Sequence, residues 1–167
     1  MRTDEPPWNS PAIIQWWNGY SVILDFTNET DTKFLKVQLD LLMEKYKIDG
    51  FKFDGGQWYH YSNLCCKNGT VLEDEKKYLR NIAWNDFGRA YKYHEYKDLY
   101  KCGGKCSISR LADRAHSWDK NGLNTIIPNT IAQGLIGHPF VCPDMIGGGE
   151  WRMFLKEGFE FDEELFV

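Results

Sequence analysis

Residues 48–56 read IDGFKFDGG and decide the fold. The apolar run ends on Asp54 and is followed by two glycines, a pattern typical of a short buried strand that enters a turn. Upstream, apolar residues recur every three or four positions between residues 34 and 46. This spacing predicts a helix, capped by Asp31 or Thr32.

A second apolar run precedes this helix. Residues 22–24 lead into the polar sequence DFTN at residues 25–28, which predicts another short buried strand entering a turn. Strand, helix and strand in this length form a βαβ unit. The default outcome of such a unit is two buried parallel strands.

The alternation continues through the second half of the chain. Short strands are predicted over residues 107–111 and 140–142. One helix is expected over residues 73–95, and another is capped within residues 117–119 and either kinks or restarts at Pro128. The fold class is therefore α/β, with strands connected by helices.

The composition is that of a globular protein, since 43% of the 167 residues are hydrophobic and 26% are charged. We expect one domain over residues 1–167. The net charge of -4, without a basic block, argues against a nucleic-acid partner. Because no window approaches the roughly 18 apolar residues of a membrane span, no membrane segment is predicted in this chain.

Cysteines and glycosylation motifs bear on the compartment. The cysteines form an adjacent pair, Cys65 and Cys66, a later pair, Cys102 and Cys106, and a separate Cys142. Their spacing is not a standard zinc pattern, so disulfides or free thiols are the stronger alternatives; in an oxidising compartment a disulfide would join the two pairs and leave Cys142 in apolar surroundings. Sequons at Asn28 and Asn68 also favour a secretory or extracellular location.

Four aspartates, Asp25, Asp54, Asp113 and Asp144, fall at or just after the ends of predicted strands. For any one of them a helix cap or a turn is the simpler interpretation. In a parallel β/α barrel, however, these strand ends converge on one mouth. Two carboxylates across such a mouth suit glycosidic cleavage, although the pattern alone also fits a metal or phosphate site.

Five blocks in order resemble those of glycoside hydrolase family 31, in its α-galactosidase-like branch. The blocks are WNG at residues 17–19, LDFTN at 24–28, GFKFD at 50–54, RLAD at 110–113 with Trp118, and GHPF with PDMIGG between 137 and 148. Their order and spacing make the resemblance specific. It implies a (β/α)8 TIM-barrel fold that is incomplete here, with about strands 3 to 7.

The resemblance implies a retaining α-glycoside hydrolase acting on an α-galactoside or α-glucoside. Asp54 matches the nucleophile and Asp113 the general acid/base. The charge on Asp54 is expected to raise the pKa of Asp113 and keep it protonated for the first step. Two carboxyl groups and a water suffice for this chemistry, so no cofactor or metal is expected.

Further residues are expected to bind the carbohydrate. They are Trp17, Asp25, Lys52, Arg110, Trp118 and Asp144. Simpler interpretations exist for some: Trp16 and Trp17 as core aromatics, and Arg110 as the partner of a surface acid. Because Lys52 falls inside an apolar strand, we expect a carboxylate to pair with its ammonium group near Asp54.

Two alternatives to an active hydrolase remain. Since family barrels are much longer, the chain is interpreted as a fragment, and an inactive relic or carbohydrate-binding pseudo-glycosidase is the second hypothesis. Gln57 stands where the branch has glutamate, which also distinguishes this site. The third hypothesis is a metal module built from Cys65, Cys66, Cys102 and Cys106.

Overall fold

The computed structural model describes residues 2–3, 11, 13–16, 19–56, 64–65 and 78–167. The chain divides into two compact units. Unit 1 is Met1–His94 with Asp98–Cys102, and unit 2 is Glu95–Lys97 with Gly103–Val167. The single domain predicted over residues 1–167 stays a prediction.

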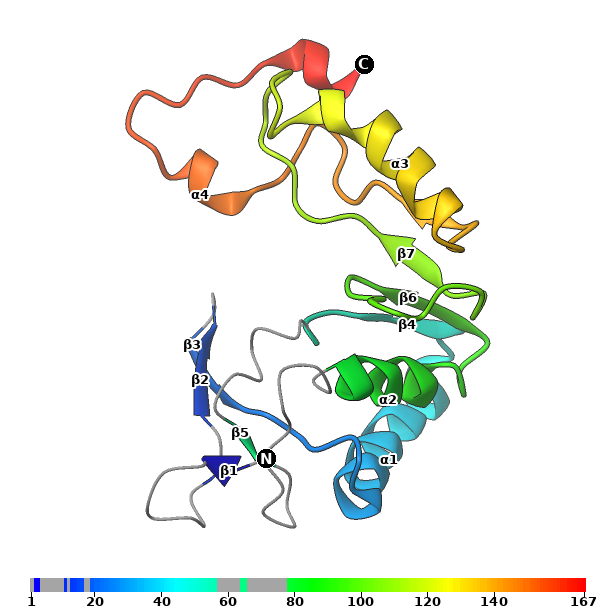
Figure 1. The fold of residues 1–167 in the computed structure, drawn as a ribbon. Coiled ribbons are helices and arrows are strands. Elements are labelled where there is room, and N and C mark those ends of the chain that lie inside the picture. The colour runs from blue at the N-terminus through cyan, green and yellow to red at the C-terminus, as the bar shows by residue number, and fades with distance from the viewer. Residues whose placement is uncertain (1, 4–10, 12, 17–18, 57–63, 66–77) are drawn as a thin grey trace. The chain divides into compact units, whose positions relative to one another are not determined.

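The fold is α/β, as predicted, and contains a four-stranded sheet (Figure 1). The strands are β4 (Gly50–Phe53), β6 (Tyr93–Tyr96), β7 (Ile108–Arg110) and β8 (Val141–Cys142), in the spatial order β4-β6-β7-β8. Both β6 with β7 and β7 with β8 run parallel. This arrangement is compatible with part of an α/β barrel, and it confirms the strands predicted around residues 50, 109 and 141.

Strand β6 was not predicted, because the preceding helix was expected to reach residue 95. Helix α2 (Tyr78–Gly88) ends at a glycine instead, and β6 begins five residues later. The segment 93–96 reads YHEY, and tyrosines favour the pleated, half-buried surface of a strand. Tyr96 is fully buried there, so packing of the sheet overrides the helical continuation.

The chain before α1 forms a β-hairpin rather than the first strand of a βαβ unit. Strands β2 (Ile13–Trp16) and β3 (Gly19–Val22) pair antiparallel, from Ile13 opposite Val22 to Trp16 opposite Gly19. The strand predicted over residues 22–24 is therefore displaced: Val22 is the last residue of β3, and residues 23 and 24 lie outside any strand. A local hairpin closes with a short loop, whereas the predicted pairing needs a long crossover.

Another short antiparallel pair joins β1 (Arg2–Thr3) to β5 (Leu64–Cys65). Neither this pair nor the β2-β3 hairpin belongs to the four-stranded sheet. Asp25 therefore does not follow one of that sheet's strands, in contrast to the prediction. The loop predicted over residues 57–71 lies largely outside the described residues.

Helix α1 (Glu29–Tyr46) confirms the main helix prediction but begins earlier than expected. Its cap is Asn28, whose side-chain oxygen accepts hydrogen bonds from the backbone N–H groups of Thr30 (2.9 Å) and Asp31 (3.3 Å). Asn28 reaches two of the unsatisfied amides at the helix start, which the predicted caps at residues 31 and 32 cannot do from inside the helix.

An aromatic cluster forms the core of unit 1. Phe53 lies 5.2 Å from Trp84 and 6.0 Å from Tyr91 between ring centroids, and Phe26 lies 4.5 Å from Trp84. Phe87 stacks on Trp84 at 5.9 Å with an interplanar angle of 5°. These rings pack β4, α2 and the residues before α1 against one another. The loop that follows β4 packs on the Trp84 ring.

Unit 2 contains the 3-10 helices η3 (Leu123–Thr125) and η4 (Glu163–Phe166) and the helices α3 (Ile126–Leu135) and α4 (Trp151–Phe154). Pro128 is the third residue of α3, where its missing N–H is tolerated. The helix therefore begins two residues before Pro128, which agrees with the predicted restart rather than with the predicted kink. Its first residue is preceded by Thr125, so the cap predicted within 117–119 is wrong.

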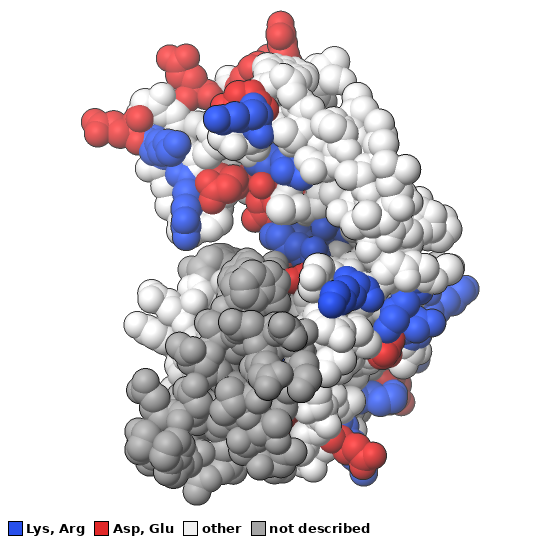
Figure 2. Space-filling model, in the orientation of Figure 1, with Lys and Arg blue, Asp and Glu red and all other residues white. Residues whose placement is uncertain are grey.

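Helix α3 carries no charged side chain, and the surface above β7 in Figure 2 is correspondingly white. Its apolar side chains are largely exposed, with Ile127 at 73% and Leu135 at 83%. Among the helices of the described residues, none combines the length and apolar character needed to cross a membrane.

Candidate functional site

In unit 1, Asp54 comes directly after β4 and lines a pocket of about 220 Å³. The two residues that follow, Gly55 and Gly56, adopt the left-handed backbone conformation, with φ of 72° and 82°. A Cβ atom on Gly56 would come within 2.6 Å of the Trp84 ring. Glycine at position 56 thus lets the backbone pass close to this indole, and Asp54 at the strand end forms part of the pocket's edge.

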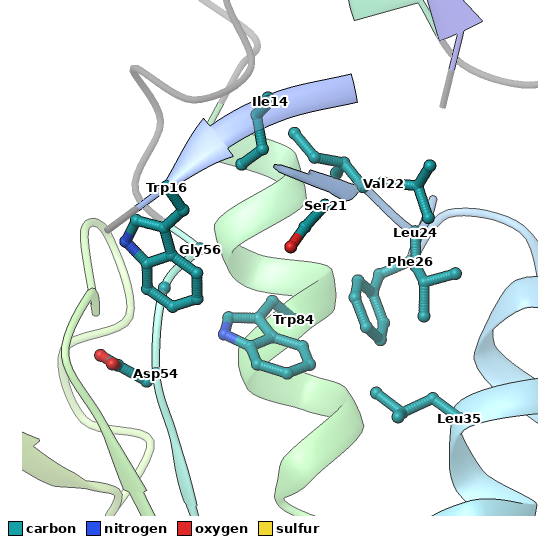
Figure 3. A pocket seen from close by; sticks show the side chains of 12 residues that line it. Ile14, Trp16, Ser21, Val22, Leu24, Phe26, Leu35, Asp54, Gly56 and Trp84 are labelled. Atoms are coloured by element: carbon teal, nitrogen blue, oxygen red, sulfur yellow. The ribbon is translucent and has the colours of Figure 1, made fainter. Parts of the chain in front are cut away.

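The wall of this pocket is mostly apolar and aromatic. It is formed by Ile14, Trp16, Ser21, Val22, Ile23, Leu24, Phe26, Leu35, Asp54, Gly55, Gly56 and Trp84. Figure 3 shows the indoles of Trp16 and Trp84 beside the pocket, with the carboxylate of Asp54 near its edge. Flat rings beside a carboxylate can cover the apolar face of a sugar, or of another flat ligand, next to a reactive oxygen.

Asp25, also in unit 1, is buried with 1% of its surface exposed. Its carboxylate accepts hydrogen bonds from the N–H (3.1 Å) and the hydroxyl (2.6 Å) of Thr27, and its own N–H donates to Asp31 (2.9 Å). These contacts are those of an Asx turn that leads into α1. Its predicted role in substrate binding stays a prediction.

In unit 2, Asp113 follows β7 and pairs with a lysine. The Nζ atom of Lys97 lies 2.5 Å from Oδ1 of Asp113. Burial by itself raises the pKa of Asp113, but the hydrogen bond and charge of Lys97, a hydrogen bond with Asp144 and the charge of Arg110 outweigh it. The net pKa of Asp113 is therefore below its usual value.

Arg110, at the end of β7, connects two further carboxylates of unit 2. Its NH1 nitrogen donates to Asp144 at 3.1 Å, and its Nε nitrogen lies 2.7 Å from a carboxylate oxygen of Glu95. The side chains of Arg110 and Asp144 are only 3% and 5% exposed. The pairing of Arg110 with an acid was one of the predicted alternatives, but the acid is buried rather than at the surface.

The structure thus brings together Asp113, Arg110 and Asp144 of the predicted site, and it adds Lys97 and Glu95. A raised pKa of Asp113 was expected from a neighbouring Asp54, whereas the groups of unit 2 lower it. Asp54 belongs to unit 1, and its separation from Asp113 stays a prediction.

Three other residues of the predicted site remain, of which two lie within the described part of the chain. Lys52 is exposed in β4, because alternation along the strand turns it away from the buried Phe53, and its predicted pairing with a carboxylate near Asp54 stays a prediction. Trp118 is 47% exposed, and its backbone carbonyl accepts a hydrogen bond from the side chain of Asn124. Trp17 lies outside the described residues.

The disulfide and metal predictions both involve Cys65 and Cys66, whose side chains are not among the described ones. Cys102 is buried, Cys106 is exposed and Cys142 is half-buried. Within the described part of the chain, no three side chains of histidine, cysteine, aspartate or glutamate gather to hold a metal ion. The sequon at Asn68 is also outside, while Asn28 caps α1.

Sequence reasoning missed Lys97, Glu95 and Trp84. The first two follow from the undetected strand β6, whose end lies beside β7 in the sheet. Trp84 was not predicted as a site residue. It lies three residues before Phe87, so both rings are on one face of α2, and this spacing is a signal that could have identified it.

No protein-family model matches the chain. Its likeness to known proteins is consistent with a glycosidase-related family. The chain is 32% identical over 148 residues to the myogenesis-regulating glycosidase of Mus musculus, which covers 86% of this chain and 20% of that protein. It is 24% identical over 176 residues to the SITS-binding protein of Tetronarce californica, covering 94% of this chain and 22% of that protein. The chain therefore spans about a fifth of the length of these curated relatives.

Proposed function

We propose that this chain carries part of the active site of a retaining α-glycoside hydrolase of family 31, on a portion of a (β/α)8 barrel. The observation that carries the proposal is Asp54 at the end of β4, in a pocket walled by two tryptophans. The likeness to a protein named a glycosidase supports the same class. The substrate is an α-galactoside or α-glucoside, in line with the family resemblance.

In this proposal Asp54 attacks the anomeric carbon, and the glycosidic bond breaks as Asp113 gives its proton to the leaving oxygen. Asp113, now ionised, then takes a proton from water. As it loses this proton, the water oxygen attacks the anomeric carbon, and the bond between that carbon and Asp54 breaks. Asp54 is left as a carboxylate and Asp113 is protonated again. This sequence requires the two carboxyl groups about 5 to 5.5 Å apart.

Trp16 and Trp84 are assigned to cover the apolar face of the sugar, since both line the pocket beside Asp54. Arg110 and Asp144 are assigned to the same site through Asp113, whose pKa they affect. Trp17, Asp25, Lys52 and Trp118 remain candidates for substrate binding.

The test is covalent labelling of the full chain with an α-configured cyclophellitol-type probe, read by intact-protein mass spectrometry and peptide mapping. We expect one probe per chain, attached to Asp54. The Asp54→Asn variant should not be labelled, and Asp113→Asn should be labelled at least about 100-fold more slowly because proton donation is lost. Equal labelling of wild type and Asp54→Asn, or none of a folded wild type, would overturn the proposal.

A pseudo-glycosidase that binds a carbohydrate without cleaving it is the second candidate. The ion pair of Asp113 with Lys97 favours it, because an ionised Asp113 cannot donate a proton in the first step. This candidate predicts saturable binding of an α-galactoside or α-glucoside by calorimetry, lost in a Trp84→Ala variant, together with no labelling of Asp54.

A further inference from the structure

The contact between Lys97 and Asp113 differs from an ordinary surface ion pair. The side chains of Lys97 and Asp113 are 17% and 31% exposed. In the pair between Lys36 and Asp40 on α1, at nearly the same distance of 2.6 Å, the exposures are 49% and 48%. Solvent and salt screen the charges of Lys97 and Asp113 less, so Lys97 has the stronger hold on its carboxylate.

The charged residues around Asp113 belong to unit 2 and lie in, or directly after, three neighbouring strands. Glu95 lies in β6 with Lys97 directly after it, Arg110 ends β7, and Asp144 follows β8. Counted as ionised groups, these five residues comprise three carboxylates and two cations. Arg110 already contacts both Glu95 and Asp144, which leaves Lys97 as the cation in direct contact with Asp113.

Removing Lys97 would therefore leave three carboxylates around one guanidinium group. Like charges so close disfavour simultaneous ionisation, and a proton would then bind to the carboxyl group that has lost its counter-ion. Asp113 is that group, because Glu95 and Asp144 keep their contacts with Arg110. The ionisation of Asp113 thus depends on Lys97 more than on the contacts among the other three residues, Glu95, Arg110 and Asp144.

We propose that Lys97 is a positioning residue that orients the carboxyl group of Asp113 by a direct ion pair and stabilises its ionised form relative to its protonated form. This inference rests on the proposed function of Asp113 as acid/base. In the first step the proton of Asp113 moves to the leaving oxygen, and Lys97 stabilises the carboxylate that results. In the second step the same carboxylate accepts a proton from water.

The test is a pH titration of the full chain with ¹³C-carboxyl-labelled aspartate, followed by NMR, with the Asp113 resonance assigned from its absence in Asp113→Asn. In Lys97→Met we expect the midpoint of Asp113 to move up by about one pH unit or more, a tenfold change in proton affinity. Lys97→Arg should restore the wild-type midpoint because the charge returns. Lys36→Met is the matched control and should leave Asp113 unchanged while moving Asp40.

If Lys97→Met does not fold, Lys97→Gln takes its place, since it keeps a hydrogen-bond donor and removes only the charge. An Asp113 midpoint unchanged in the folded neutral variant, or one that Lys97→Arg fails to restore, overturns the inference. The titration needs no turnover and is therefore independent of the labelling of Asp54. A shifted midpoint in a chain that is never labelled would support the hold of Lys97 on Asp113 while overturning the proposed hydrolase.

Discussion

The two carboxylates proposed for catalysis sit in opposite kinds of surroundings. Asp54 in unit 1 lies at the edge of an apolar pocket. The residues before and after it, Phe53 and Gly55, lie beside the rings of Trp84 and Trp16. Asp113 in unit 2 stands among four charged residues and is joined directly to one of them. A retaining mechanism needs two carboxyl groups with different roles, and in the proposed pair one lines an aromatic pocket while the other lies in a charged cluster.

This difference shows which forces position each group. Asp54 depends on aromatic packing, because β4 and its following loop rest on Phe53 and the ring of Trp84. Asp113 depends on ion pairs, because it contacts Lys97 directly and lies beside the buried pair of Arg110 and Asp144. The first arrangement should respond to changes in side-chain volume and the second to changes in charge and pH.

The largest expected effect is on the packed side of this comparison. Phe53→Ala removes a ring that is 4% exposed and in contact with Trp84, Phe87 and Tyr91. We expect it to lower the free energy of unfolding by about 3 to 5 kcal/mol, measured by urea denaturation. Phe34→Ala on α1 is the control, since Phe34 is 59% exposed, and a loss from it as large as from Phe53→Ala would contradict this account.

Next comes the charged side. Arg110→Met leaves the carboxylates of Asp144 and Glu95 without this guanidinium partner, and a buried charge that loses its partner costs about 3 kcal/mol. The same denaturation experiment measures the loss. Arg89→Met removes the exposed pair with Asp86 and should change stability by less than about 0.5 kcal/mol. Equal losses from both variants would mean that the cluster in unit 2 behaves as an ordinary surface.

The smallest effect is that of pH on the two lysine–aspartate pairs. The pKa values of Asp113 and Asp40 are both lowered on folding, so each pair stabilises the fold above the unfolded carboxyl pKa of about 4 and loses that contribution as pH falls through the folded value. Asp113→Asn should therefore flatten the decline of Tm between about pH 4 and pH 2.

Added salt should distinguish the effects of the two lysine–aspartate pairs on Tm in the same experiment. Because Lys36 and Asp40 are about half exposed, 1 M salt should reduce the effect of Asp40→Asn on this decline to the part that comes from the hydrogen bond with Tyr91. The effect of Asp113→Asn should persist in part, since its pair is less exposed. If salt abolishes both effects equally, the distinction drawn between the buried and the exposed pair is wrong.

Periodic and local signals predicted much of the fold. The 34–46 spacing found α1, and short apolar runs found β4, β7 and β8, because strand and helix periods are written into neighbouring residues. The same signals failed at β6, where tyrosines of a strand follow a helix, and at the β2-β3 hairpin, where a nearby partner competes with a distant one. Partner choice between strands is not a local property.

The sequence by itself determined which residue types stand at the strand ends, and so which aspartates were available for chemistry. Only the tertiary structure decided what surrounds them. Lys97 reaches Asp113 across 16 positions of sequence, and Arg110 reaches Asp144 across 34. Parallel strands bring such distant residues to neighbouring ends of one sheet, and because a carboxyl group's ionisation depends on those neighbours, its state could not be read from the chain alone.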